Sequence, residues 1–439
     1  MNTSEFSSVS TKQQRIAQLA KQSPEMIFTS LAHHMDIVWL EEAYRRTKKN
    51  GASGVDGVTA KEYEANLREN LMGLLERAKS GRYKAPPVRR AYIPKGDGKG
   101  ELRPIGIPAL EDKVLQRAVC MLLEPIYEQD FMNSSFGFRP GRSSHQALGV
   151  IWKETMRMNG GWILDVDIRN YFDTIDHGHV QAMLRQRVSD GVVTRLIGKW
   201  LNAGVQEKDQ LSYPEAGSPQ GGVISPLLSN IYLHHVMDVW FETVVKPHMT
   251  GKVFMVRFAD DLVVGFSDKQ DAIRIMEVLP KRFGKFGLTL HPEKTRLVPF
   301  NRPRKAEQKP GPECGTFDFL GFTHYWGRSL KGNWVVRRKT ISKRLSSKIQ
   351  GIGKWCRDNR HLPIKDQHKI LSSKLQGHYQ YYGINGNSSC IGAFRHAVTR
   401  LWFKWLNRRT RKGKRSWGSF RDFLKHYPLP MPKVMHYNI

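Results

Sequence analysis

Two apolar runs, 253–258 (VFMVRF) and 262–266 (LVVGF), are separated only by Ala259, Asp260 and Asp261. Short runs rich in β-branched and aromatic residues, joined by so few residues, predict a tight β-hairpin. Because both runs are apolar on both faces, we expect the hairpin to be covered on both sides and central in its sheet. The hairpin therefore places two adjacent carboxylates at one end of a buried sheet.

Adjacent carboxylates repel each other and are costly to desolvate unless a cation compensates for their charge. A third carboxylate, Asp167, falls near the end of another predicted buried strand, 162–168. Carboxylates at the ends of two neighbouring strands can hold a pair of Mg²⁺ ions for nucleotidyl transfer. An Asp-Asp pair alone indicates a solvated turn, but the apolar strands around this pair favour a metal site.

The charge of the chain predicts a polyanionic partner. Lys and Arg number 70 against 40 Asp and Glu, and the formal net charge is +30. Residues 340–439 contain 21 Lys and Arg, three Asp and no Glu. No apolar run approaches the ~20 residues that span a bilayer, and residues 1–18 lack the apolar segment of a secretory signal. We therefore expect a nucleic-acid partner, no membrane partner and a location in the bacterial cytoplasm.

The order of the predicted elements is mixed α and β first, then helices. Residues 89–107 predict two strands joined by a basic turn, residues 110–127 an amphipathic helix, and residues 225–244 an apolar helix. Three further helices are predicted at about 341–356, 364–378 and 389–409, with many Lys and Arg on their polar faces. The four cysteines lie far apart and predict neither a zinc site nor a disulfide framework.

Several sequence blocks occur in an order that resembles a known family. They are YIPKGDGKGELRPIGIP (92–108), SSFGFRPGRSSHQAL (134–148), DIRNYFD (167–173), SPQGGVISPLLSNIYL (218–233), FADD (258–261), HPEKT (291–295) and FLGF (319–322). Together they resemble a group II intron-encoded reverse transcriptase and maturase of the bacterial type, over roughly residues 50–411. The resemblance implies an α+β fold in the form of a right-hand polymerase, with fingers, a palm built on an antiparallel sheet, a helical thumb/maturase domain and a short basic DNA-binding tail. The implied domains are 1–80 (N-terminal extension and start of the fingers), 81–325 (fingers and palm), 326–400 (thumb/maturase) and 401–439 (basic DNA-binding region).

The resemblance also assigns roles to individual residues. The implied ligands of two Mg²⁺ ions, for which Mn²⁺ can substitute, are Asp167, Ile168, Asp260 and Asp261. The implied nucleotide-binding residues are Lys95 (or Lys99) and Arg103 on the triphosphate, Phe172 beneath the sugar, Gln220 on the incoming nucleotide and Lys294 near the pyrophosphate. The implied nucleic-acid-binding residues are Arg139, Arg142, the primer-grip residues Phe319, Leu320 and Gly321, and Lys404, Arg408, Arg409, Arg411 and Lys412.

Each of these assignments has a simpler alternative. Phe172 and the residues around Leu320 could be ordinary core packing, and Gln220 could belong to a plain turn. Lys95 and Arg103 could belong to a solvated hairpin, and the remaining cations to exposed basic surface. Sequence alone does not decide between these readings.

Two departures from the family pattern stand out. Phe258 takes the place of the usual tyrosine before the Asp pair. The sequence also has no Cys-x-x-Cys pairs, and for that reason we expect no endonuclease activity.

The implied function is an RNA-directed DNA polymerase that binds a structured intron RNA, assists its splicing and copies it at an insertion site. Its partners would be the intron RNA, an RNA template with a DNA primer, target DNA and dNTPs. Alternatives are a splicing-only maturase, a bacterial reverse transcriptase that serves defence or repair, and a basic RNA chaperone.

Overall fold

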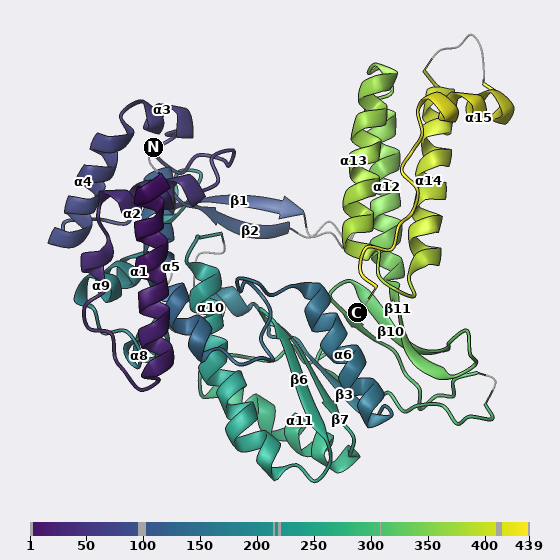
Figure 1. The fold of residues 1–439 in the computed structure, drawn as a ribbon, viewed down its shortest axis with the longest axis horizontal. Helices are drawn as coiled ribbons and strands as arrows, with labels where there is room; N and C mark the ends of the chain where they lie inside the picture. The colour runs from purple at the N-terminus through teal and green to yellow at the C-terminus, as the bar shows by residue number, and fades with distance from the viewer. Residues whose placement is uncertain are drawn as a thin grey trace.

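The computed structural model describes residues 3–94, 102–213, 216–217, 221–307, 309–409 and 415–437. Figure 1 shows a cluster of helices from the N-terminal part on one side, a sheet with its helices in the middle, and a set of long C-terminal helices that stand apart from the first cluster. The predicted order, mixed α and β followed by a basic helical region, is confirmed. Within the described ranges, no helix is long and apolar enough to cross a bilayer.

The N-terminal cluster packs around one long buried helix, α5 (Leu110–Asp130). Trp39 is fully buried and donates its indole N–H to the Ala118 carbonyl of α5 at 3.0 Å, which fixes α2 against that helix. The other helices of this cluster are α1 (Thr3–Gln22), α2 (Ile37–Arg46), α3 (Ala60–Ala65), α4 (Leu67–Ser80), α8 (His177–Arg185) and α9 (Gly191–Leu201), with a 3₁₀ turn at Ala32–His34.

A four-stranded sheet extends from this cluster toward the C-terminal helices (Figure 1). Its order is β2-β1-β4-β5, with β1 (Val88–Pro94) antiparallel to β2 (Leu102–Ile107), and with β4 (Val205–Glu207) and β5 (Gln210–Ser212) beside them. The two strands predicted within 89–107 are confirmed, whereas the basic turn between them lies outside the described residues.

The central sheet has the order β6-β7-β3-β8, and all of its neighbouring strands are antiparallel. Its strands are β3 (Trp162–Val166), β6 (Val253–Phe258), β7 (Asp261–Phe266) and β8 (Arg296–Pro299). One face packs on α11 (Lys269–Gly284) and the other on α6 (Ser144–Met158), so the sheet separates two hydrophobic cores.

The predicted hairpin is confirmed as β6 and β7, and it is covered on both faces. Its predicted central place is wrong for β6, which is an edge strand of the sheet. The segment before α6 covers that edge, because Arg257 donates its backbone N–H to the Ser134 carbonyl and accepts one from Phe136, both at 2.8 Å. An irregular segment thus satisfies both backbone groups of Arg257, which an edge strand would otherwise expose.

The predicted helix at 225–244 is confirmed as helical but is not uniform. It begins as α10 (Ser225–Leu233) and continues through two π-helical turns, His234–Asp238 and Phe241–Val245, before a 3₁₀ turn at Lys246–His248. A short helix, α7 (Tyr171–Thr174), follows β3 at the same end of the molecule as the start of α10.

A third sheet leads into the C-terminal helices. It comprises β9 (Phe317–Phe319), β10 (Phe322–Arg328) and β11 (Trp334–Thr340), in the order β11-β10-β9. The helices are α12 (Ser342–Asp358), α13 (Ile364–Tyr382), α14 (Ser388–Leu406) and α15 (Trp417–His426), so the three predicted helices are confirmed. The boundary predicted at 325/326 falls inside β10, and the one predicted at 400/401 falls inside α14.

Candidate active site

The Asp-Asp pair lies at the tip of the β6–β7 hairpin. Phe258 pairs with Asp261, which leaves Ala259 and Asp260 as a two-residue turn. Ala259 adopts φ 57°, the left-handed region that a residue with a Cβ rarely occupies. The turn is therefore strained, and surrounding contacts must hold it in place.

The register of the sheet brings the third acid to the same end. β3 pairs with β7 so that Val166 lies opposite Leu262, and Asp167 follows directly beside the hairpin tip. Ile168 is buried and forms a bridge with Leu290. The register thus places all three acids that the sequence singled out at the same end of the sheet.

The electrostatics of the acids show that they interact. Burial raises the pKa of Asp260, and the charge of Asp167 raises it further. The surrounding protein raises the pKa of Asp261 to about 6, with Asp260 and Asp167 adding to the shift. Its side chain nevertheless reaches solvent. These carboxyls are therefore crowded by like charge, and that of Asp261 remains accessible to solvent.

A fourth acid, Asp165, lies two residues before Asp167 on β3. Residues two apart on a strand project to the same face. Burial raises the pKa of Asp165 to about 6, and the Arg296 side chain, 3.5 Å away, opposes that shift. The sequence reasoning missed Asp165, although the alternation in Leu-Asp-Val-Asp could have indicated it.

Cations from three parts of the chain face these acids. Lys294 places its Nζ 3.4 Å from both carboxylate oxygens of Asp167. The positive charges of Arg103 on β2 and Arg344 on α12 oppose the rise that burial causes in the pKa of Asp260 and of Asp261, respectively. A cleft of about 910 Å³ joins these elements; its lining includes Ile93, Pro94, Arg103, Lys294, Lys343, Arg344, Ser347, Lys348, Tyr381 and Tyr382.

The loop that carries Lys294 is held against the end of β3. The Asp167 carbonyl accepts the backbone N–H of His291 at 2.8 Å, and the Thr295 hydroxyl lies 3.3 Å from both the Asp167 N–H and its carbonyl. The backbone of Asp167 therefore positions the loop that brings Lys294 to the Asp167 carboxylate.

The other predicted nucleotide-binding residues are described in part. Phe172 is partly buried in α7, and its ring meets the Tyr171 ring edge to face at 5.2 Å between centroids. Lys95 and Gln220, together with Lys99, lie outside the described residues. Their predicted roles stay predictions.

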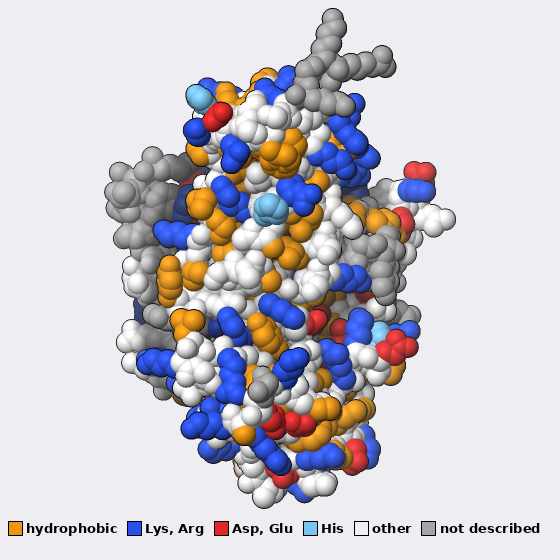
Figure 2. Space-filling model, turned by 90° about the vertical axis from the view of Figure 1, so that its right-hand side faces the viewer, with side chains coloured by type: hydrophobic (Ala, Val, Ile, Leu, Met, Phe, Trp, Pro, Cys, Tyr) orange, Lys and Arg blue, Asp and Glu red, His pale blue; other side chains and the backbone are white. Residues whose placement is uncertain are grey.

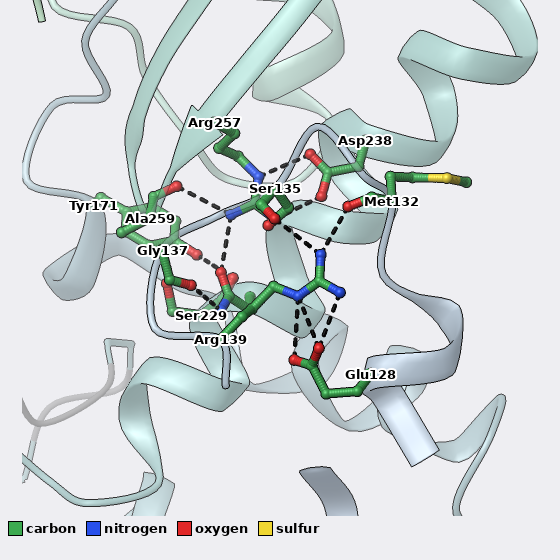
Figure 3. A network of polar contacts seen from close by, with 11 residues as sticks. Glu128, Met132, Ser135, Gly137, Arg139, Tyr171, Ser229, Asp238, Arg257 and Ala259 are labelled. Carbon is green, nitrogen blue, oxygen red and sulfur yellow. Dashed lines mark hydrogen bonds and ion pairs between the residues drawn. The ribbon is translucent and has the colours of Figure 1, made fainter. Parts of the chain in front are cut away.

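Arg139 and Arg142 belong to one loop but have different surroundings. Arg139 is buried and forms an ion pair with Glu128 at 3.0 Å; it also donates to the carbonyls of Met132 and Ser135 (Figure 3). These bonds use most of the Arg139 donors, and its burial excludes the exposed-loop alternative. The predicted phosphate contact of Arg139 stays a prediction. Arg142 is partly exposed and donates to Asn133 at 2.7 Å, so its predicted phosphate contact stays open.

The predicted primer-grip residues form the tight turn between β9 and β10. Phe319 and Phe322 are buried, and the Leu320 carbonyl accepts the Tyr381 hydroxyl of α13 at 2.8 Å. Leu320 and Gly321 both have positive φ, 47° and 86°. The turn therefore packs the sheet onto the C-terminal helices, next to the cleft.

The predicted basic residues at the C-terminal end are only partly described. Lys404 and Arg408 are exposed, and their cationic groups lie 5.6 Å and 5.2 Å from the centre of the Trp405 ring. Arg409 donates to the His361 carbonyl at 3.2 Å. Arg411 and Lys412 lie outside the described residues. Trp402, by contrast, is fully buried in the core of the helices.

The donor set suits a hard cation such as Mg²⁺. In the described part of the chain, no three His, Cys, Asp or Glu side chains converge closely enough to form a complete metal cage. Mg²⁺ typically takes only one or two carboxylates and completes its shell with water and substrate phosphates. Asp260 and Asp261, whose pKa values are raised by burial and by neighbouring carboxylates, are therefore a suitable partial ligand set.

An antiparallel sheet with several acids at one end, beside a cleft lined by Lys and Arg, defines a nucleic-acid polymerase. Residues 93–324 match the family described as reverse transcriptase (RNA-dependent DNA polymerase). The chain belongs to this family, and it is an RNA-directed DNA polymerase of the group II intron and maturase type.

Three relatives show how far the similarity extends. Protein YkfC of Escherichia coli is 36% identical over 328 residues, which is 67% of this chain and 85% of YkfC. The group II intron-encoded protein LtrA of Lactococcus lactis is 37% identical over 228 residues, 51% of this chain and 37% of LtrA. The putative COX1/OXI3 intron 1 protein of Saccharomyces cerevisiae is 29% identical over 407 residues, 81% of this chain and 45% of that protein. The similarity thus spans less than half the length of either intron protein.

Asp261→Asn should stabilise the metal-free protein at neutral pH. The pKa of Asp261 is about 6 in the folded state against 3.8 ordinarily, so the wild type loses stability as the pH rises from about 4 through about 6. The expected gain is on the order of 1 kcal/mol, after discounting for the solvent exposure of the side chain. Thermal unfolding in EDTA across this pH range measures it. Asp209→Asn, an exposed acid between β4 and β5, is the control, and a lower Tm for Asp261→Asn would contradict the prediction.

Proposed function

We propose that this reverse transcriptase binds a group II intron RNA, assists its splicing and copies the intron into DNA. The observation that carries the proposal is one cleft lined by Arg103, Lys294 and the basic face of α12. Lys294 lies against Asp167, and the charges of Arg103 and Arg344 act on Asp260 and Asp261. A duplex of template and primer needs phosphate contacts from a basic surface while its 3′ end lies at the acids. Lys343, Arg344 and Lys348 of α12, which line this cleft, would supply such contacts.

Asp167, Asp260 and Asp261 would hold two Mg²⁺ ions, with the Ile168 carbonyl as a further ligand. These ions supply activation of the 3′-hydroxyl and stabilisation of the leaving pyrophosphate. Lys294 and Arg103, with Lys95, would bind the triphosphate, since charge-assisted bonds to its oxygens are strong. Phe172 would exclude a 2′-hydroxyl by its bulk, and Gln220 would contact the incoming nucleotide.

The domain assignment follows from these roles. The β1–β2 hairpin and the N-terminal helices would form the fingers, the central sheet with α6 and α11 the palm, and α12–α14 the thumb and maturase region. Figure 2 shows that Lys and Arg side chains predominate over Asp and Glu on the face formed largely by the C-terminal part. That face would bind intron RNA, and the region after α14, which contains Arg411 and Lys412, would contact target DNA.

The intron-splicing part of the proposal has its own test. Splicing of the flanking group II intron should be faster with the protein than without it when Mg²⁺ is low, because bound protein stabilises the folded RNA. Asp260→Asn should support splicing as well as the wild type does, since it leaves the basic surfaces intact. Splicing rates that do not respond to the protein would remove the maturase role, whatever the polymerase assay shows.

A second candidate is a reverse transcriptase that serves defence or repair. The match covers 85% of Protein YkfC, whose name refers to no intron, but only 37% of the intron-encoded LtrA, so a role outside introns is the second candidate. DNA synthesis on an unrelated RNA template, combined with no effect on splicing, would favour this candidate. Retained splicing activity would favour the intron protein.

A further inference from the structure

Arg257 is a fully buried cation on β6, two residues before the hairpin turn at Ala259. Its side chain is 1% exposed and that of its partner Asp238 is 0% exposed. The two form a bidentate ion pair, with Nε–Oδ1 at 2.8 Å and Nη2–Oδ2 at 2.5 Å. Asp238 comes from the first π-helical turn after α10, a kind of irregularity often found at functional sites.

The remaining donors of Arg257 reach the hairpin turn and the segments around it. Nη1 donates to the Ala259 carbonyl at 3.1 Å and to Asn230 Oδ1 at 3.0 Å, and Nη2 donates to the Ser135 hydroxyl at 2.7 Å. All five N–H groups of the guanidinium therefore have an acceptor. Figure 3 shows this network, in which Arg257 lies between Asp238 and the turn at Ala259.

The other side of the turn is held by Gly137. A Cβ on Gly137 would lie 2.2 Å from the Ala259 nitrogen, so only glycine permits this approach. Asn230, which accepts from Arg257, also donates to the Gly137 carbonyl at 2.8 Å. The strained Ala259 backbone is thus fixed between the Gly137 segment and the Arg257 guanidinium.

Stability alone does not account for this arrangement. Replacing a buried ion pair with apolar residues is often neutral or even stabilising, and β6 is otherwise an apolar strand in a well-filled core. What an apolar residue could not provide is a fixed donor to the carbonyl of a left-handed residue at the turn. The contacts of Arg257 are therefore those expected of a residue that sets the conformation of the turn.

We propose that Arg257 is a positioning residue for DNA synthesis. Anchored by Asp238, it fixes the Ala259 carbonyl and thereby the direction in which Asp260 and Asp261 project into the cleft. The inference rests on the proposed role of these two acids. Without this anchor, the turn relaxes, and the carboxylates no longer present their oxygens in the geometry that a cation and the nucleotide require.

The test is Arg257→Lys, with Arg187→Lys as a matched control. Arg187 is also buried and forms a bidentate pair with Asp130, at 2.8 Å and 3.1 Å, but it contacts the segment around Met26 and not the hairpin. Both variants keep the charge and lose the guanidinium fork. They should lower the Tm by similar amounts.

The two variants should differ in chemistry. For Arg257→Lys we expect the maximum rate of single-nucleotide incorporation to fall about 10- to 100-fold, as is typical when a group that orients metal ligands is removed. Its affinity for primer–template should stay unchanged, and its binding of Mn²⁺ alone, followed by electron paramagnetic resonance, should weaken. Arg187→Lys should retain the wild-type rate and Mn²⁺ binding.

Equal rates and equal Mn²⁺ binding in the two variants would overturn the inference. If Arg257→Lys does not fold, Asn230→Ser is the variant to test. It removes one contact to Arg257 and the contact to the Gly137 carbonyl, and it leaves the Arg257–Asp238 ion pair intact. A wild-type rate and wild-type Mn²⁺ affinity in Asn230→Ser would also overturn the inference. Asp260→Asn distinguishes a failure of the role of the acids from a failure of the positioning role of Arg257. If that variant still makes DNA, the role of the acids fails; if it is inactive and Arg257→Lys behaves like its control, only the positioning role fails.

Discussion

Asp260→Asn should abolish DNA synthesis and leave the fold intact. Asp260 occupies the apex of the hairpin turn, and its raised pKa shows that its negative charge is unfavourable in the metal-free fold. Asparagine keeps the shape and removes that charge, so stability should not fall. The loss of one charged ligand should reduce the rate of nucleotide incorporation by at least about 10³-fold.

Primer extension on an RNA template with Mg²⁺ measures this loss. Asp209→Asn, which removes an exposed acid between β4 and β5, should extend the primer at the wild-type rate. Primer–template affinity, measured without dNTPs, should be the same in all three proteins, which separates chemistry from binding. DNA synthesis by Asp260→Asn at the wild-type rate would show that this carboxylate takes no part in the reaction.

The hairpin and its acids could be predicted from sequence because the information is local. Two apolar runs separated by three residues allow few structures, and the turn necessarily carries Asp260 and Asp261 to one end. The approach of Asp167 needed only the further assumption that the strands are neighbours, which the β3–β7 register confirms. The edge position of β6 could not be predicted, because it depends on the distant segment 134–136 that covers it.

Long-range partners explain most of what the sequence left open. Arg139 and Arg142 look alike in Phe-Arg-Pro-Gly-Arg, and only the proximity of Glu128 on α5 decides that Arg139 is buried. Arg257 was visible as a charge inside an apolar strand, and a buried charge requires a partner. The sequence offered no means of identifying Asp238 as that partner. Phe258 is partly buried beside the second core, and nothing in the structure explains why it replaces tyrosine.

Removing three cations from α12 should weaken the binding of primer–template far more than removing three cations elsewhere. Lys343, Arg344 and Lys348 line the same cleft as Lys294, which contacts Asp167. Burial and the nearby Arg344 lower the pKa of Lys348, as expected for cations crowded on one face. A bound phosphate backbone would relieve this repulsion. Replacing all three with alanine should reduce the affinity about 10²- to 10³-fold at low salt, and should lower the slope of log Kd against log salt by about 3.

The matched control removes three cations that lie outside this cleft. Lys354 and Arg357 line a separate groove between α12 and α14, and Lys365 is exposed on α13. Both triple-alanine variants change the net charge equally, so a general effect of charge would weaken binding equally in both. Measuring affinity without dNTPs keeps any effect of Arg344 on Asp261 out of the comparison. We expect a large loss only in the α12 cleft variant, because only there would the cations and the acids contact the same duplex. Equal losses in the two variants would show that α12 has no special role in template binding.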